Sequence, residues 1–173
     1  MLIRRERAAD AASVHAIHAA AFAPAYEDGR PPEPDLVDAL RRSPAWIEQL
    51  SLVAVRDDAI VGHVCCTRAH LRPNGQPVLG LGPIGVAPNQ QRKGVGAALM
   101  HAVIAAADAR DEPLIVLLGH AEYYPRFGFV PAADLGITPP VLEWAPAFFA
   151  RTLATYSPSL TGEFQYAEPF LNL

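Results

Sequence analysis

One stretch, residues 79–100 (LGLGPIGVAPNQQRKGVGAALM), constrains the fold more than any other part of the sequence. Its first part, residues 79–86, is apolar and interrupted by glycines, which is typical of a strand that closely approaches another group. A polar turn follows, and from Gly94 onward the apolar residues recur at helical spacing. The stretch therefore predicts a strand, a glycine-rich turn and a helix over residues 94–110 in direct succession.

The junction between the turn and the helix is suited to binding an anion. The first N–H groups of a helix have no partners within it and carry the positive end of its dipole. Gly94 and Gly96 bring no side chain that would keep a phosphate away, and Arg92 and Lys93 add positive charge. The P-loop pattern is absent, and the GxGxxG pattern fails because Leu99 stands where its third glycine belongs.

A proline inside the predicted strand should interrupt its pairing. Pro83 follows Gly82 within residues 79–86, and proline donates no ladder hydrogen bond, so a bulge or an edge is expected there. We interpret this break as functional, because it leaves backbone N–H and C=O groups free for a ligand. A simple bulge at the rim of the sheet is the alternative.

Length and composition limit the classes of protein to be considered. With 173 residues, of which 51% are hydrophobic, the chain is most simply one globular domain over residues 1–173. A net charge of −4 offers no basic surface, so we expect no nucleic-acid partner. The N-terminal residues lack the apolar run of a signal peptide, and no apolar stretch is long enough to cross a bilayer. We therefore expect a cytoplasmic protein without membrane contact.

The remaining elements are predicted from periodicity and turn residues. They are a strand (2–7), a helix (11–22, with Asp10 as N-cap), a short helix around Leu36 and Leu40, hairpin strands (50–56 and 60–68), a buried parallel strand (114–118), a short helix (120–127), a strand (129–131), a helix (148–153) and a last strand (162–168). The order predicts a mixed α/β fold in which antiparallel N-terminal strands precede a strand–helix–strand crossover.

Several reactive side chains are expected to be structural. Cys65 and Cys66 are adjacent and would point to opposite faces of a strand, which disfavours a disulfide, and no partner at motif spacing makes either a nucleophile. His63 lies in the middle of a strand and is assigned to the core. His15 and His18 are three residues apart on a helix, but with no third ligand in sight we expect no metal.

Two blocks of the sequence resemble the GCN5-related N-acetyltransferase (GNAT) superfamily. Residues 91–96 (QRKGVG) are similar to its [QR]-x-x-G-x-[GA] signature, and residues 123–129 (YYPRFGF) are similar to its Y-x-x-x-G-F segment. The two blocks lie within residues 79–131, and the order of the other elements fits the family. One position departs from it, because many relatives carry an asparagine where Leu117 stands here.

The resemblance implies a GNAT fold with a splayed parallel pair of strands, flanked by helices, and acetyl-CoA as cosubstrate. The pantetheine arm would pair with Ile84, Gly85 and Val86, and the N–H of Val86 would polarise the thioester carbonyl. The expected contacts of the diphosphate are Gln91, Arg92, Lys93, Gly94, Val95, Gly96 and Ala97. Tyr123 and Phe127 would line the pantetheine or adenine side.

The implied reaction is direct transfer of the acetyl group to a primary amine in a ternary complex. Tyr124, four residues before Gly128, would protonate the leaving thiolate, although a tyrosine can equally be a packing residue. The general base stays open between His120, its neighbour Glu122, a water chain and the acids of the loop that covers the acceptor site in relatives. These acids are Glu27, Asp28, Glu33 and Asp35.

The sequence leaves two further alternatives for the function open. A non-catalytic acyl-CoA sensor on the same fold would bind the cosubstrate without acetylating an amine, and transfer of a longer acyl group is not excluded by the small residues of the strand 79–86. The apolar segment 148–156 (FFARTLATY) could pack against a second copy, so a homodimer is considered.

Overall fold

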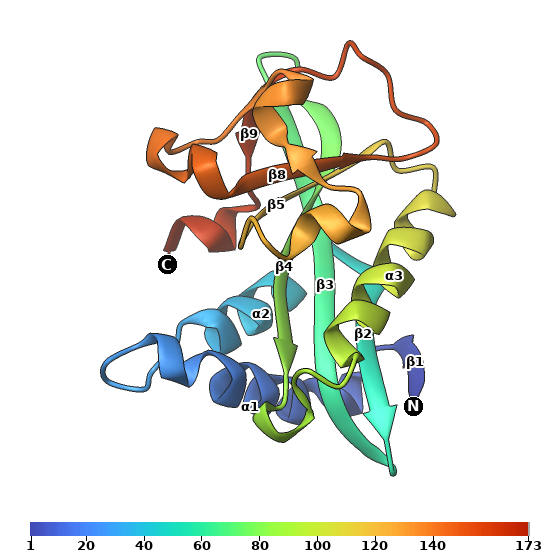
Figure 1. Cartoon of the computed structure of the whole chain (residues 1–173), viewed down its shortest axis with the longest axis vertical. Coiled ribbons are helices and arrows are strands. Elements are labelled where there is room, and N and C mark those ends of the chain that lie inside the picture. Colours follow the sequence, from blue (N-terminus) through green and yellow to red (C-terminus); the bar gives the residue numbers. More distant parts are fainter. Residues whose placement is uncertain (173) are drawn as a thin grey trace.

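The structure, a computed structural model, describes residues 1–172, and within them nine strands form one mixed sheet (Figure 1). The strands lie in the order β1-β2-β3-β4-β5-β8-β6, and β9 pairs with both β3 and β7. Their bounds are β1 Leu2–Arg5, β2 Trp46–Arg56, β3 Ala59–Arg72, β4 Gln76–Val86, β5 Leu114–Leu118, β6 Val130–Pro131, β7 Ile137–Thr138, β8 Phe148–Thr152 and β9 Gly162–Gln165. β1 to β4 are antiparallel and β4 is parallel to β5, which confirms the predicted mixed fold.

The helices of the described chain cover both faces of the sheet. Their bounds are α1 Ala11–Phe22, α2 Glu33–Arg42 and α3 Val95–Asp108. Leu52 and Ala54 of β2 share a buried cluster with α3, whereas Val53 between them packs with Val14 of α1 and Val37 of α2. Because alternate residues of a strand point to opposite faces, α3 covers one face and α1 and α2 cover the other. Within residues 1–172, none of these helices has the length and apolar character that a membrane crossing demands.

The predicted interruption of β4 is confirmed. Between the pairs Val64↔Ile84 and Cys66↔Leu81, β4 contains one residue more than β3, at Gly82-Pro83. This is the geometry of a β-bulge, which a residue without an N–H tolerates. The bulge lies three residues before the end of β4, so it disrupts the pairing with β3 close to the turn that leads to α3.

The parallel pair separates after a short contact, as a splayed pair does. β4 pairs with β5 at Leu79↔Ile115 and Gly80↔Val116, and no further pair joins these two strands among the described residues. β4 nevertheless continues beside β3 to its end. Over residues 81–86 the edge of β4 that faces away from β3 is therefore unpaired, and its backbone groups are available.

The predictions for the C-terminal part were partly wrong. The predicted helix 148–153 is instead the strand β8, because Phe148–Thr152 pair antiparallel with β5 from Leu118↔Phe148 onward and so complete the sheet. Residues 120–127 contain only a 3-10 turn, η4 (Tyr124–Phe127), in which Pro125 occupies the first turn. Phe148 and Phe149, the two aromatic residues of this segment, are buried in the core of the chain itself.

The N-terminal part holds two smaller differences. Glu33 and Asp35, expected in a loop, lie in the first turn of α2, where Pro34 fits and where acids complement the helix dipole. Asp10 precedes α1 as predicted, but its carboxylate does not cap that helix. It accepts the N–H of Arg7 at 2.7 Å and both terminal nitrogens of Arg4, at 2.6 and 3.0 Å.

Candidate active site

The start of α3 presents backbone N–H groups that have no hydrogen-bond partner within the part of the chain that the structure describes. Gly94 is its N-cap, with φ 83°, and no side chain caps the first turn. The first backbone bond at this end runs from the N–H of Ala98 to the carbonyl of Gly94, at 3.0 Å. The N–H groups of residues 95–97 precede that bond, and no described residue accepts them. A side-chain carbon at Gly94 would meet nothing within 4 Å, so the space before the helix is open.

The turn before α3 is exposed and joined to the end of β4. Gln91 donates from Nε2 to the carbonyl of Val86 at 3.1 Å, which ties the two parts together. Arg92 and Lys93 are exposed and form no ion pair with a described residue. Arg92 has φ 58°, a left-handed conformation that helps to close the turn.

Gly96 is the point where three of the predicted residues meet. A Cβ added to it would lie 3.1 Å from the hydroxyl of Tyr123 and 3.7 Å from Cγ2 of Val86. Glycine at this position therefore makes room for the Tyr123 hydroxyl beside the first turn of α3. The Tyr123 ring packs edge-on against Phe127, 5.2 Å between centroids, and Arg126 lies over it at 4.9 Å.

The register of β4 fixes the direction of its backbone groups. Val86 lies opposite Gly62 of β3, and the N–H of Ala87 donates to the carbonyl of Val61 at 2.9 Å. In an antiparallel ladder this bond makes Val86 and Gly62 a non-hydrogen-bonded pair, so the N–H and C=O of Val86 point away from β3. Ile84, two residues earlier, points the same way. The open edge of β4 thus presents the amides of Ile84 and Val86, whereas Gly85 bonds to β3.

Tyr124 lies largely in the core. Its side chain is 8% exposed and belongs to the cluster that contains Phe127 and Phe129. Burial, together with the neighbouring Tyr123, raises the pKa of Tyr124 to about 12. Its hydroxyl donates to no described residue and is not among the buried polar atoms that lack a partner. The phenol therefore holds its proton at neutral pH, and no residue from 1 to 172 accepts that proton.

The candidates for the general base lie in different places. His120 and Glu122 are exposed in the segment that follows β5. Glu33 accepts a hydrogen bond from the Tyr26 hydroxyl at 3.0 Å, and its other oxygen, Oε2, is buried without a partner among the described residues. The remaining loop acids, Glu27, Asp28 and Asp35, are exposed. Leu117 is buried in the core, so its side chain does not replace the family's asparagine.

His18 and His63, which the sequence analysis assigned to structural roles, are in contact in the core. Both are fully buried, and Nε2 of His18 lies 2.8 Å from Nδ1 of His63. Nδ1 of His18 has no hydrogen-bond partner among the described residues, and it lies 2.8 Å from where a Cβ of Gly85 would be. In the sequence, His18 lies on the apolar stripe of its helix. A polar side chain at such a position needs a hydrogen-bond partner in the core, and His63 is that partner.

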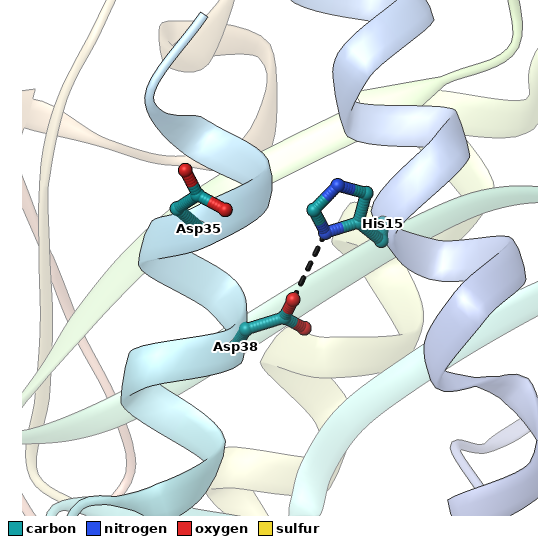
Figure 2. A group of neighbouring side chains, drawn as sticks. All are labelled: His15, Asp35 and Asp38. Carbon is teal, nitrogen blue, oxygen red and sulfur yellow. Dashed lines mark hydrogen bonds and ion pairs between the residues drawn. The ribbon is translucent and has the colours of Figure 1, made fainter.

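His15 and His18, which the sequence analysis took as structural residues, have different partners in the structure. His15 of α1 faces Asp35 and Asp38 of α2, and their ligand atoms all lie within 4.8 Å of one another (Figure 2). His15 Nδ1 is 2.9 Å from Asp38 Oδ2, and Asp38 Oδ1 accepts Arg41 at 2.6 Å. The Arg41 cation already neutralises part of this charge, so the arrangement is explained as an ion-pair network between two helices.

The cysteines behave as predicted. Cys65 and Cys66 are free and buried in different clusters, on opposite faces of β3. Burial raises the pKa of both thiols, so neither is a thiolate near neutral pH.

Comparison with known protein families and sequences gives a consistent result. The family model described as the acetyltransferase (GNAT) domain matches residues 2–132. The chain is 32% identical over 166 residues to the uncharacterized N-acetyltransferase YjhQ of Escherichia coli K12, an alignment that covers 92% of this chain and 88% of that protein.

Solved structures resemble the whole fold. A GNAT family acetyltransferase from Brucella melitensis in complex with acetyl-CoA has a TM-score of 0.79 and 32% identity, over 98% of this chain and 97% of that one. The GNAT family N-acetyltransferase YhbS from Escherichia coli, in complex with CoA, has a TM-score of 0.85 and 26% identity, over 98% and 91%.

Proposed function

This chain belongs to the GNAT acetyltransferase family and is an acetyl-CoA-dependent acyltransferase, and we propose that it acetylates a primary amine by direct attack in a ternary complex. The observation that carries this proposal is that two sets of free backbone groups lie next to each other. The uncapped start of α3 and the open edge of β4 adjoin where Val86 lies against Gly96. One ligand with a diphosphate and an extended arm can bind both.

The diphosphate of acetyl-CoA would bind at the turn and the first turn of α3. The amides of Gly94, Val95, Gly96 and Ala97 would donate to its oxygens, and Arg92 and Lys93 would supply positive charge. Gln91 would position the turn through its bond to the end of β4. Tyr123 and Phe127 would line the same side of the ligand, since the Tyr123 hydroxyl lies at the helix start.

The pantetheine arm would add to the open edge of β4 as a further strand. Ile84 and Val86 direct their backbone groups to that edge, while Gly85 remains bonded to β3. The thioester carbonyl would then accept the N–H of Val86, which would stabilise the oxyanion that forms when the amine attacks.

Tyr124 would give its proton to the thiolate of CoA as the tetrahedral intermediate collapses. Its raised pKa keeps the phenol protonated at neutral pH, and no described residue competes for that proton. Glu33 stays a candidate for the acceptor side, because a buried carboxylate oxygen without a partner attracts an ammonium group. His120, which is exposed, and a water chain are the other candidates for the base.

The test measures thiol release from acetyl-CoA with spermidine, tyramine, Nα-acetyl-lysine and an aminoglycoside, and identifies the product by mass spectrometry. Amine-dependent thiol release with an N-acetylated product supports the proposal. Tight CoA binding without turnover on any of these amines favours the alternative, an acyl-CoA sensor on the same fold. Reaction in the cytoplasm without nucleic acid or membrane is part of the proposal.

A further inference from the structure

A space beside the bulge of β4 is left open by the described residues. Gly82 lies between the buried residues Leu81 and Pro83, yet a Cβ built on it would meet no described atom within 4 Å. The same construction on Gly80 and Gly85 meets side chains at 3.3 and 2.8 Å. Within this part of β4, the open space therefore lies at the bulge, where the edge that faces away from β3 begins to be unpaired.

On the face of β4 that points away from α3, side chains of other elements stand on both sides of this space. Gly80 and Gly85 point to that face, because the residues next to each of them pack with α3. The ring of Tyr166 lies 3.6 Å from a Cβ built on Gly80, and the imidazole of His18 fills the position of a Cβ on Gly85. The space at Gly82 is thus bordered by Tyr166 at one end and by His18 at the other.

The geometry of a β-ladder determines the direction from which an amine would reach the acyl carbon. A thioester carbonyl that accepts the N–H of Val86 would lie roughly in the plane of the sheet, as ladder carbonyls do. A nucleophile approaches a carbonyl carbon from above or below the plane of its substituents, so the amine would approach along the normal of the sheet. One face is covered by α3 and Tyr124, and on the other face His18 fills the place beside Val86. The approach that remains is at the bulge.

Across the splayed pair, the end of β5 places an apolar side chain beside this approach. Gly80 pairs with Val116, and Leu118 follows two residues later on the same face, level with the bulge. This is the face away from α3, because Val116 shares a cluster with Phe164, which also lies against Gly80. Leu118 is 41% exposed, whereas residues 114–117 of the same strand are at most 1% exposed.

Two aromatic rings border the approach together with Leu118. Trp144 lies edge-on to Tyr166, with 6.3 Å between ring centroids, and both side chains are partly exposed. The turn that carries Trp144, η6 (Leu142–Ala147), is joined to the end of β5, because the N–H of Gly119 donates to the last carbonyl of η6 at 2.8 Å. We call Leu118, Trp144 and Tyr166 the apolar wall. An accessible apolar surface beside a reaction centre is typical of a ligand-binding site.

The chemistry of the apolar wall fits an uncharged, aromatic substituent. Its three side chains carry no charge, and the neighbouring acids Glu143 and Glu168 are exposed. An aromatic ring packs edge-to-face or offset against rings such as Trp144 and Tyr166 and removes a large apolar area from water. A polyamine would instead place its second ammonium group against uncharged carbon atoms, where burial of a charge is unfavourable.

We propose that the apolar wall binds the aromatic part of the acceptor, and that the acceptor is an arylalkylamine, in which a short alkyl chain joins a primary amine to an aromatic ring. The inference rests on the proposed function and names the substrate class of the same site. The amine would lie at the bulge beside Gly82, and the ring would pack against Leu118, Trp144 and Tyr166. The apolar wall determines specificity and adds no step to the acetyl transfer.

The experiment compares kcat/KM for phenethylamine, n-butylamine and spermidine at saturating acetyl-CoA. Phenethylamine should exceed n-butylamine about 30-fold, because its ring removes more apolar surface from water than the short alkyl chain does. Leu118→Ala and Trp144→Ala each remove part of the apolar wall and should lower this ratio about fivefold. Leu142→Ala is the control, since it changes a leucine that is 77% exposed in the same turn as Trp144, and it should keep the wild-type ratio.

The ratio of the two amines decides, because a loss of folded enzyme would lower both values alike. An unchanged ratio in both Leu118→Ala and Trp144→Ala would overturn the proposal, as would a wild-type ratio near one or a wild type that prefers spermidine. A wild type that acetylates no amine would contradict the proposed function, and calorimetry would then compare phenethylamine and n-butylamine binding to the CoA complex. Tighter phenethylamine binding that Leu118→Ala weakens would still support the apolar wall, and equal affinities would overturn it.

Discussion

The ring of Tyr124 lies so close to Gly119 that residue 119 can carry no side chain. A Cβ built on Gly119 would be 2.2 Å from Cε2 of Tyr124 and 3.0 Å from two further ring carbons. Gly119 directly follows β5, so the end of that strand packs against the ring of Tyr124. Arg151 of β8 supports the turn that contains Tyr124, because it donates a short hydrogen bond to the carbonyl of Phe127 at the end of that turn. The catalytic tyrosine of the proposal is thus positioned by two neighbouring strands.

Replacement of Gly119 by alanine should therefore displace the phenol. The new methyl group would overlap the ring, and relief of such overpacking costs about 1–3 kcal/mol of stability. We expect Gly119→Ala to lower the melting temperature and to reduce kcat at least tenfold, with little change in the affinity for CoA. Ala121→Ser, at an exposed position two residues later, should behave as wild type. Full activity of Gly119→Ala would show that the position of Tyr124 does not matter.

The two adjacent tyrosines should give different kinetic results. Tyr124→Phe removes the proposed acid and should lower kcat about 100-fold, because a positioned acid contributes roughly 10²–10⁴. Tyr123→Phe removes a hydroxyl that lies at the start of α3, so it should weaken CoA binding and leave kcat nearly unchanged. Steady-state kinetics and calorimetric CoA binding separate the two outcomes. The opposite pattern would exchange the roles of Tyr123 and Tyr124.

The elements that the sequence predicts best are those whose signal is local. The run of glycines and apolar residues over β4, the periodicity of α3 and the apolar residues of β5 all lie within short windows, and their order predicts the crossover. β8 was misassigned because Phe148 and Phe149 become strand residues only by pairing with β5, some thirty residues earlier in the chain. Tertiary pairing overrides local preference there.

The candidate site also combines parts with a local sequence signal and parts that depend on tertiary packing. The amides at the start of α3 follow from the glycine-rich turn, so a local pattern was sufficient to propose them. The contact between His18 and His63 joins residues 45 apart, and Glu6, which follows β1, lies 3.3 Å from Nε2 of His63. No spacing rule predicts such a network, because it depends on how α1 packs across β3 and β4.

Gly94 should be needed for its backbone conformation and for the space above it. Alanine at φ 83° costs about 1–2 kcal/mol, and its methyl group would point into the open space where the diphosphate is proposed to bind. We expect Gly94→Ala to weaken CoA binding at least tenfold, measured by calorimetry. Gly75→Ala is the matched control, because Gly75 also has positive φ (65°) and free space around it but lies in the β3–β4 hairpin. Equal affinities of both variants would contradict the phosphate site.

Acid should destabilise the fold through the buried histidines. Burial lowers the pKa of His18 and of His63, so both are neutral when folded, while the unfolded chain takes up protons below about pH 6.5. Their stabilising effect is complete above that pH and is lost as the pH falls, by up to about 1.4 kcal/mol per pH unit for each histidine. The melting temperature should decline between pH 6.5 and pH 5. The double variant His18→Gln, His63→Gln should decline less steeply, and His70→Gln as wild type.

The most direct measurement is the response of individual amide signals of ¹⁵N-labelled protein to CoA and to acetyl-CoA. We predict that both ligands shift the amides of Gly94, Val95 and Gly96, and that acetyl-CoA shifts the amide of Val86 more than CoA does. Unchanged signals at these four residues in the saturated complex would contradict the claim that free backbone groups of α3 and β4 bind the cosubstrate.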